Sequence, residues 1–479
     1  MTPLWLALHL PYLPLEVFRR GTPGVAAGSP GSADAMAVCA GSRVLLPDAA
    51  ALRQGLRPGM ALSAARALVP DLLALPRDTA LESSTLEGLA LWAGQFSPMC
   101  SLAPPDGLLL EVGGCLRLFG GLDALLARVR AGLPALGFDA VAACAPTPGG
   151  ARLLARCGLE TCAPDLDTLA VQVSRLPLEA LEVAPAVLEG LQNLGVRTLG
   201  ECLNLPRDGL ARRFGRELPD QLDRALGRQP DPQPPFVPPV RFSSRLVLPV
   251  PVPSVEPLLF GTRRLAEELS GFLASRQAGA AALRLSLVHE SGPATEVDLS
   301  LTMPSRDAAH LVALLRERLS RLCLRAPVEA VVLSCDRSLQ LAPRHFSLFA
   351  GSEDGAVPRA ELVERLRARL GREAVHGLVL VPEHRPELAF REAEPGTPCP
   401  PPPAGRRPLW LLAEPKPVAV AGLQLLEGPE RIETGWWDGP EVRRDYHVAS
   451  TADGARVWVY LEHGTGDGPG RWFLHGLFA

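Results

Sequence analysis

The chain begins with an apolar run that has the pattern of a buried strand. Residues 4–10 are almost entirely hydrophobic, and a short run of this kind is typical of a strand in a protein core. His9 lies near the end of the run, and Pro11, Tyr12 and Pro14 follow it. The end of such a strand is where an enzyme would be expected to offer an acid or a nucleophile, and this strand offers neither.

Between residues 240 and 342 the apolar spacing alternates between the two-residue repeat of strands and the longer repeat of helices. It predicts strands at 245–250, 282–290, 295–302 and 328–335, and helices at 257–276 and 305–325. This βαββαβ order packs two helices on one face of a four-stranded sheet.

The second of these predicted helices carries four arginines among its leucines, namely Arg316, Arg318, Arg321 and Arg325. They could make one face of the helix basic, or they could form an ordinary solvated helix face. The pattern does not separate the two interpretations.

Residues 188–215 contain an apolar helical pattern that breaks at Gly195 and resumes after Thr198, which can cap a second helix. This order resembles a helix-hairpin-helix, whose hairpin N–H groups can hold a DNA phosphate without reading sequence. Gly195, Arg197 and Thr198 are therefore candidate DNA-binding residues. A plain helical hairpin with a glycine turn fits the same pattern.

Two proline-rich stretches, at 229–239 and 395–403, divide the chain, and such stretches favour semi-rigid extended spacers. Residues 406–479 follow the second stretch and hold five of the seven tryptophans and two of the three tyrosines. Short aromatic runs separated by glycine and aspartate predict a small β-rich module. Its aromatic residues could form either a compact core or an interface.

The composition changes this picture in three respects. A net charge of -4 and a pI near 6.2 exclude a generally basic nucleic-acid-binding protein, so any DNA contact must come from local patches. The ten cysteines are scattered and lack metal or redox spacing, which favours reduced thiols. The N-terminus lacks a positively charged leader and no apolar run is long enough to span a bilayer, so we expect a cytoplasmic, nucleoid-associated protein.

Several segments, in order, resemble the Y-family of translesion DNA polymerases. Residues 50–72 (AALRQGLRPGMALSAARALVPDL) resemble the fingers pattern of that family, 96–112 (FSPMCSLAPPDGLLLEV) its second palm motif, and 145–158 (APTPGGARLLARCG) its A-x-N-K-L-L-A-K run. The hairpin and the βαββαβ unit follow in the order of the family. The resemblance implies an α+β multidomain fold: a polymerase-like right hand of palm, fingers, helix-hairpin-helix thumb and βαββαβ little finger, plus a small β-rich C-terminal module.

The resemblance also implies an organisation along the chain. Its parts are a palm (1–20 and 75–165), fingers (21–74), a thumb (166–228), a linker (229–239), a little finger (240–342), a clamp-motif segment with a helical extension (343–394), a second linker (395–405) and a C-terminal partner-binding module (406–479).

The acids that the family uses for catalysis are mostly replaced. Two Mg²⁺ ions about 3.5–4 Å apart must be held by converging carboxylates. His9 and Pro11 stand where the first palm strand of the family has its two aspartates, and Pro14 stands at its steric gate. In the second motif Asp106 is retained and Gly107 replaces a glutamate. The resemblance therefore implies a non-catalytic protein with vestigial positions and no metal or cofactor.

No neighbouring acid takes the place of the missing carboxylates. Glu111 lies five residues beyond Asp106, and an odd offset along a strand points to the opposite face. Glu16 lies beyond two prolines. A neutral His9 could ligate a metal, but Mg²⁺ prefers oxygen ligands, so a structural histidine is the favoured interpretation.

The nucleotide-binding residues of the family are changed as well. Its triphosphate-binding tyrosine and arginine correspond to Ala49 and Leu52. Arg152 keeps a cation where the family has a phosphate-binding lysine, and Arg156 lies one helical turn further on. Both arginines are candidate DNA-binding residues.

A Y-family body without its acids, followed by an added C-terminal module, resembles the ImuB group of polymerase-like proteins from bacterial mutagenesis cassettes. That resemblance implies a non-catalytic scaffold that binds primer-template DNA and the beta sliding clamp. It also implies recruitment of an error-prone C-family DNA polymerase, and of a RecA-like accessory protein that docks on the C-terminal region.

A candidate clamp-binding peptide follows the predicted little finger. Its residues His345, Phe346, Ser347, Leu348 and Phe349 resemble the Q-L-x-L-F peptide that inserts paired apolar anchors into the clamp pocket, with histidine in place of the preferred glutamine. A last strand that buries its two phenylalanines is the alternative.

Two other functions stay open at this point. One is an active or residual Y-family polymerase that uses Asp106 with other ligands. The other is a DNA-binding protein with neither a clamp nor a polymerase partner.

Overall fold

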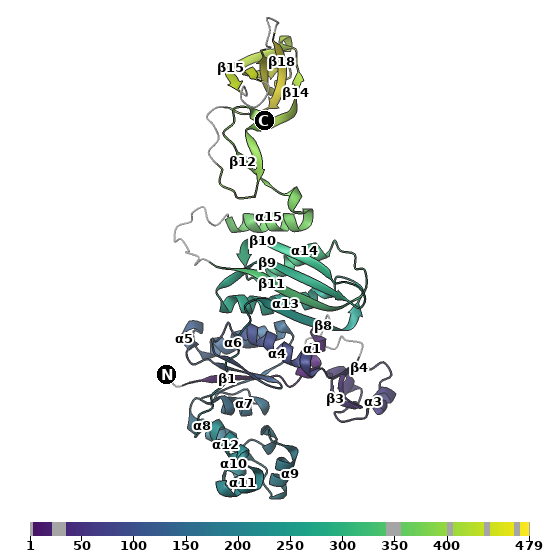
Figure 1. Ribbon diagram of the computed structural model, residues 1–479, viewed down its shortest axis with the longest axis vertical. Coiled ribbons are helices and arrows are strands. Elements are labelled where there is room, and N and C mark those ends of the chain that lie inside the picture. The colour runs from purple at the N-terminus through teal and green to yellow at the C-terminus, as the bar shows by residue number, and fades with distance from the viewer. Residues whose placement is uncertain are drawn as a thin grey trace. The chain divides into compact units, whose positions relative to one another are not determined.

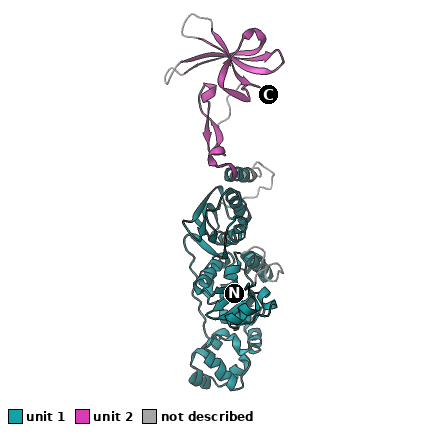
Figure 2. Ribbon diagram, turned by 90° about the vertical axis from the view of Figure 1, so that its right-hand side faces the viewer, with its two compact units in different colours: residues 1–368 teal, residues 369–479 magenta. Residues whose placement is uncertain are grey.

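The computed structural model describes residues 3–21, 35–341, 356–399, 406–434, 441–463 and 470–478. The chain separates into two units, residues 1–368 and 369–479, coloured differently in Figure 2. The described part of the first unit holds three sheets, and the second unit is built mainly of strands.

The predicted N-terminal strand lies inside a sheet of order β5-β6-β1-β7 (Figure 1). The elements of this layer are β1 (Trp5–His9), β5 (Cys100–Ala103), β6 (Gly107–Glu111) and β7 (Val141–Ala145), with α4 (Thr79–Ala93), α6 (Leu122–Leu136) and α7 (Pro148–Arg156). Leu6 and Leu8 pack among buried residues of α4 and α6, whereas Ala7 packs among buried residues of α7. Burial of both faces explains why the run is continuously apolar.

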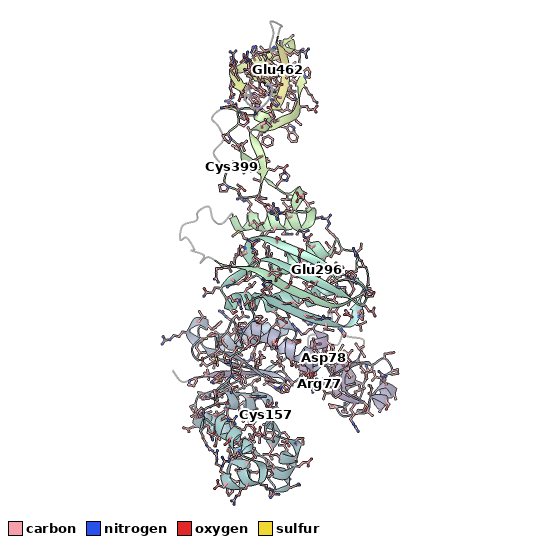
Figure 3. All side chains as sticks on the ribbon, viewed as in Figure 1. Arg77, Asp78, Cys157, Glu296, Cys399 and Glu462 are labelled. Carbon is pink, nitrogen blue, oxygen red and sulfur yellow. The ribbon has the colours of Figure 1, made fainter. Side chains whose placement is uncertain are left out.

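The chain leaves β1 through an exposed Pro11 and enters α1 (Leu13–Arg19). Pro14 lies in the first turn of that helix, where a missing N–H group costs no hydrogen bond. Helix α4 begins after Asp78, whose carboxylate accepts a 2.9 Å hydrogen bond from the Leu81 N–H group (Figure 3). These local signals fix where the two helices start.

The fingers-like part is a small sheet of order β3-β2-β4 with two short helices. Its elements are β2 (Met36–Ala40), β3 (Arg43–Pro47), β4 (Leu73–Pro76), α2 (Ala49–Arg53) and α3 (Leu62–Leu68). Its core is formed by small and branched side chains from the three strands, the two helices and the loops that follow the helices. Ala37, Val44 and Leu56 are almost fully buried.

The thumb-like part is helical throughout its described elements. These are α8 (Leu166–Ser174), α9 (Pro185–Asn193), α10 (Leu199–Leu203), α11 (Arg207–Phe214) and α12 (Glu217–Ala225). Helix α9 ends before Gly195, whose φ of +82° favours glycine, and α10 starts directly after Thr198. The predicted break and restart are therefore confirmed.

The middle of the chain has the predicted βαββαβ order in an antiparallel sheet of order β10-β9-β11-β8. The elements are β8 (Phe242–Val252), α13 (Leu258–Ser275), β9 (Ala278–His289), β10 (Thr295–Ser305), α14 (Ala308–Leu319) and β11 (Val328–Gln340), followed by α15 (Ala356–Leu370). Leu283, Leu285 and Leu287 alternate along β9 and pack into the same core as α13 and α14.

One prediction about this part was wrong. The second helix was expected to reach residue 325 but ends at Leu319, so Arg321 and Arg325 lie beyond it. Leu322 and Leu324 both pack against the core, and residues two apart cannot share one helix face. The chain must therefore leave the helical conformation, and the four arginines do not form one helix face.

The second unit contains a two-stranded and a five-stranded sheet, the latter of order β14-β18-β17-β16-β15. Their strands are β12 (Gly377–Leu380), β13 (Phe390–Ala393), β14 (Trp410–Pro417), β15 (Leu423–Thr434), β16 (Val442–Thr451), β17 (Arg456–Glu462) and β18 (Arg471–Leu477). Tyr446 is buried, stacks on Trp458 at 4.1 Å between ring centroids and contacts Tyr460 at 5.0 Å. These three aromatic residues form a core rather than an interface.

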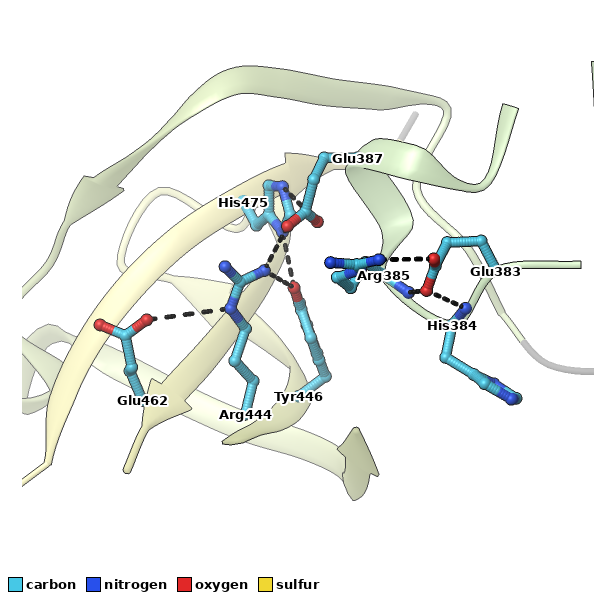
Figure 4. Close-up of polar contacts among 8 residues, drawn as sticks. All are labelled: Glu383, His384, Arg385, Glu387, Arg444, Tyr446, Glu462 and His475. Atoms are coloured by element: carbon cyan, nitrogen blue, oxygen red, sulfur yellow. Dashed lines mark hydrogen bonds and ion pairs between the residues drawn. The ribbon is translucent and has the colours of Figure 1, made fainter. Parts of the chain in front are cut away.

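A polar cluster ties this sheet to the short helical turn η3 (Pro386–Leu388) of the same unit (Figure 4). Arg444 Nη1 donates to Glu387 Oε1 at 2.9 Å and to the Tyr446 hydroxyl at 3.3 Å. That hydroxyl lies 2.8 Å from His475 Nδ1. Burial lowers the pKa of His475, and the nearby Arg444 adds to this effect while Glu387 opposes it.

All ten cysteines lie within the described residues, and none of them is joined in a disulfide. Among the described helices, none combines the length and apolar character that a membrane crossing requires.

Candidate functional site

Three of the predicted site residues meet where β1 and β6 lie side by side. His9 pairs with Gly107 across the two strands, and Asp106 lies in the turn before β6. The Asp106 carbonyl oxygen accepts a 2.7 Å hydrogen bond from the Leu10 N–H group. His9 Nδ1 lies 3.4 Å from Asp106 Oδ1. The motif at His9 and the motif at Asp106 and Gly107, which the family resemblance assigns to one site, are therefore adjacent in space.

Gly107 lies so close to neighbouring backbone atoms that a side chain at its position would press against them. A Cβ atom there would lie 3.0 Å from the Leu8 carbonyl oxygen and 3.3 Å from the Ala103 carbonyl oxygen. Both contacts are to backbone, which cannot move aside as a flexible side chain would. A carboxylate at this position would therefore require a shift of the strands.

Cations surround the retained acid. Arg156 on α7 places Nη1 3.9 Å from Asp106 Oδ1, and Arg152, one turn earlier, donates to the Pro104 carbonyl oxygen at 2.8 Å. Glu182, in the segment before α9, pairs with Arg152 at 2.5 Å and also with Arg156. The result is a chain of alternating charges from the palm-like turn to the thumb-like helices.

The pKa of Asp106 reflects these neighbours. Burial by itself would raise the pKa, but the contact with His9 and the charges of Arg156 and Arg152 outweigh burial and lower it. Asp106 is therefore an ionised carboxylate at neutral pH whose charge is compensated by protein groups. It is unsuited to take up a proton as a general base.

The described residues contain no group of three His, Cys, Asp or Glu side chains that could hold a metal ion. Glu111 lies at the far end of β6, where its Oε1 accepts hydrogen bonds from Leu4 N at 3.3 Å and Gly113 N at 3.0 Å. Glu16 is buried in α1 and accepts a 2.7 Å hydrogen bond from Asp139 N. Burial raises the pKa of Glu16 to about 8. Neither acid joins Asp106.

A polar cleft of about 310 Å³ adjoins the two arginines of α7. Its walls include Arg152, Arg156, Glu182 and Asp231. Asp231, in the proline-rich stretch, accepts a 3.1 Å hydrogen bond from Gly149 N in the first turn of α7. Glu182 and Asp231 thus compensate the positive groups of the cleft. No motif in the sequence singles out either acid.

The helical hairpin is closed by its own hydrogen bonds. Glu201 Oε2 accepts from the N–H groups of Arg197 at 2.7 Å and Thr198 at 3.3 Å, and the Thr198 hydroxyl accepts from Glu201 N. Gly195 N donates to Gln192 O at 2.9 Å. Glu201 was missed, although Thr198 followed three residues later by Glu201 is the sequence signature of a capping box.

Exposed arginines gather on the same helical part. Arg197 on the hairpin is exposed, and so are Arg212 and Arg213 at the end of α11 and Arg216 just beyond it. Arg212 and Arg216 line an open depression of about 630 Å³ together with Arg207 and Asp220, which pair with each other. This is a local basic patch on a chain whose net charge is negative.

The open face of the middle sheet is different. Arg284 on β9 pairs with Asp298 on β10 at 2.6 Å and lies 3.6 Å from Glu296 (Figure 3 labels Glu296). Arg245 on β8 pairs with Glu329 on β11 at 3.9 Å. The charges of this face compensate one another, so it offers less attraction to phosphate than the helical patch.

Two further predicted regions can be placed. Ala49 and Leu52 lie in α2, and neither side chain can bond to a phosphate. The candidate clamp peptide, residues 345–349, lies outside the described residues.

Comparison with known proteins adds a family. The pattern of the impB/mucB/samB family matches residues 22–156. "Protein ImuB" of Caulobacter vibrioides, in strains NA1000 and ATCC 19089, is 31% identical over 464 residues, which is 89% of this chain and 100% of the relative.

Two solved structures are also similar. An insertion ternary complex of Dbh DNA polymerase shows 17% identity and a TM-score of 0.40, covering 71% of this chain and 100% of that one. DinB from Sulfolobus solfataricus shows 18% identity and a TM-score of 0.39, covering 70% of this chain and 98% of that one.

The α+β Y-family polymerase-like fold and the ImuB resemblance expected from the sequence are thus both confirmed. The match to the Caulobacter protein extends over that relative's whole length and over 89% of this chain. The chain belongs to the ImuB family of Y-family polymerase-like proteins.

Proposed function

We propose that this protein is a non-catalytic, polymerase-like scaffold that binds primer-template DNA in translesion synthesis. The surroundings of Asp106 carry the proposal. Two magnesium ions need several converging carboxylates, whereas here His9 and Arg156 lie near the single acid and Gly107 supplies no second one. Cations take the place of the metal ions in balancing its charge.

The scaffold would bring an error-prone C-family DNA polymerase and a RecA-like accessory protein to the sliding clamp after DNA damage. Membership of the ImuB family supports this role. The resemblance of residues 345–349 to a clamp-binding peptide supports a clamp contact. We assign the RecA-like contact to the C-terminal module, residues 406–479.

We further propose that DNA phosphates contact the thumb-like helices mainly through side chains. The hairpin N–H groups of Arg197 and Thr198 are bonded to Glu201, so a phosphate would have to displace this carboxylate to reach them. The exposed side chains of Arg197, Arg213 and Arg216 require no such exchange. Contact by Arg152 and Arg156 would likewise require release of Glu182.

Primer extension tests the absence of catalysis. With purified full-length protein, a primed template, all four nucleotides and either Mg²⁺ or Mn²⁺, we expect no extension above that of the Asp106→Ala variant. Extension that Asp106→Ala abolishes would overturn the proposal and favour a residual polymerase.

Fluorescence anisotropy with a labelled primer-template tests the DNA surface. Replacing Arg213 and Arg216 together with alanine should weaken binding and reduce the dependence of log K on log salt by about two. Arg117→Ala, which removes an exposed arginine from α5 (Leu116–Phe119), serves as the control. Equal losses for the control and the double variant would count against this assignment.

The clamp contact has its own test. Replacing Leu348 and Phe349 with alanine in the full chain should abolish retention on an immobilised clamp while DNA binding is unchanged. Retention that stays at the wild-type level would refute the peptide assignment, whereas a wild type that the clamp does not retain would favour the DNA-binding alternative without a clamp partner.

A further inference from the structure

Helix α15 (Ala356–Leu370) exposes its leucines, whereas a helix that only packs on a sheet would bury them. Leu362, Leu366 and Leu370 follow one another at intervals of four residues and are exposed, with 56% of Leu362 accessible. The buried positions between them are Glu364 and Ala368. A surface helix normally buries its leucines and exposes its carboxylates, so this pattern is inverted.

The carboxylate of Glu364 fixes the rotation of this helix. Its Oε1 accepts hydrogen bonds from Thr302 N at 2.6 Å and Met303 N at 3.1 Å, and its Oε2 lies 2.8 Å from His310 Nε2. The pairing of β10 with β9 is interrupted between Ser300 and Ser305. Thr302 and Met303 lie in this interruption, on the edge strand of the sheet beside which α15 runs (Figure 1).

Turning the leucines inward would remove Glu364 from these two N–H groups. Glu364 is itself buried, and a buried carboxylate that loses its hydrogen-bond donors is costly. The exposed leucines are therefore held outward by the bonds of Glu364. They form a fixed apolar stripe, which we call the leucine face (Leu362, Leu366 and Leu370).

Charged residues flank the leucine face, and most of them are basic. Arg359 and Arg365 are exposed beside it, Arg367 is half-buried, and Glu361 is the single exposed acid on this stretch of the helix. An apolar ladder with basic flanks complements a helix with an apolar ladder and acidic flanks. The charges therefore indicate which kind of partner could cover the leucines.

We propose that the leucine face docks an acidic amphipathic helix of a partner protein. A second copy of α15 would bring basic flanks against basic flanks, which disfavours self-association. DNA would match the arginines but would leave the leucines without apolar contacts. The proposal concerns a surface distinct from the Asp106 site and from the thumb-like arginines, and it does not depend on the absence of catalysis.

The test uses the full-length protein and a synthetic probe. The probe is a fluorescein-labelled helical peptide with leucines at intervals of three and four residues, flanked by glutamates, and a second peptide carries lysines instead. We expect the acidic probe to bind and the basic probe to bind at least about tenfold more weakly. Replacing Leu362 and Leu366 with alanine, which keeps helix propensity, should weaken acidic-probe binding by about tenfold or more.

Charge reversal tests the choice of partner directly. Arg359→Glu combined with Arg365→Glu should weaken the acidic probe and strengthen the basic one. Leu118→Ala, which truncates an exposed leucine on α5, is the matched control and should change neither affinity. Unchanged melting of each variant shows that the fold is kept.

Three outcomes would overturn the proposal. The first is that the acidic probe fails to bind, or binds equally to the leucine variant and the wild type. The second is that the wild type sediments as a dimer that Leu366→Ala dissociates, which would show that a second copy covers the face. The third is that the charge-reversal variant loses affinity for DNA while neither peptide binds, which would show that the helix is a nucleic-acid contact.

Discussion

Nδ1 of His9 lies 3.4 Å from Oδ1 of Asp106, so the residue at the tip of the first strand contacts the retained acid of the second motif. In a two-metal site both positions would be carboxylates that share cations. Here a ring nitrogen and the Arg156 guanidinium stand beside one carboxylate, and these protein groups lower its pKa.

Neutralising Asp106 should destabilise the fold modestly. Asp106→Asn removes the charge that attracts His9 and Arg156, and we expect a loss of about 1 kcal/mol in the free energy of unfolding at pH 7. Because the pKa of Asp106 is lowered in the fold, its contribution is present above the unfolded value of 3.8 and disappears as the pH falls through the folded value. Urea unfolding at pH 7 measures the loss, and the exposed Asp71→Asn is the control.

Restoring an acid at position 107 should fail. Gly107→Glu, alone or with His9→Asp, pushes a Cβ atom against two carbonyl oxygens, and we expect a loss of about 2 kcal/mol or more and no primer extension. Gly114→Glu is the matched control, because a Cβ atom there meets only a side-chain oxygen at 3.8 Å. Equal melting temperatures for the two variants would contradict the close contact at Gly107.

Glu16 should make the first unit less stable at alkaline pH. Its folded pKa is raised to about 8 by burial, so its stabilising contribution is full below 4.5 and is lost as the pH rises through about 8. The amide of Glu16→Gln can still accept from Asp139 N and carries no charge. We expect this variant to melt above the wild type at pH 9 and close to it at pH 5. The exposed Glu87→Gln, on α4, should show no such change.

His475 should give the second unit the opposite pH dependence. Burial lowers its pKa below 6.5, so an unfolded chain binds the proton more readily and stability falls as the pH drops below 6.5. The groups that face the ring are Tyr446, Arg444, Glu387 and Tyr460. The difference in melting temperature between the wild type and His475→Gln should therefore change between pH 7.5 and 5.5.

His447→Gln, on strand β16 of the same sheet, is the control for this measurement. If its melting temperature follows pH in the same way as that of His475→Gln, the assignment of the effect to His475 is wrong.

Local sequence signals predicted a large part of the fold. The apolar alternation along β9, with Leu283, Leu285 and Leu287 inward, identifies a strand without any knowledge of its partners. Gly195 and Thr198 mark the hairpin because their backbone and capping preferences act within a few residues. Such signals need no information about the rest of the chain.

The remainder depends on contacts between distant segments. Glu182 and Asp231 lie far along the chain from Arg152 and Gly149, and only the folded chain brings them to α7. The inverted pattern of α15 also escapes prediction. Glu364 is buried where it accepts hydrogen bonds from N–H groups that the irregular strand β10 leaves without a partner on the next strand. The aromatic residues of the second unit could be assigned to a core only once Tyr446 and Trp458 were seen to stack.

The proline-rich stretch after α12 is anchored rather than free. Asp231 bonds to Gly149 N, Phe236 N donates to the Cys100 carbonyl oxygen at 2.7 Å, and Arg276 donates to the Pro239 carbonyl oxygen at 2.6 Å. A freely tethered domain loses chain entropy at the moment when it closes on a ligand. In this protein the tether loses that entropy when the chain folds, so a ligand that binds both the helices and the sheet finds the connection already ordered.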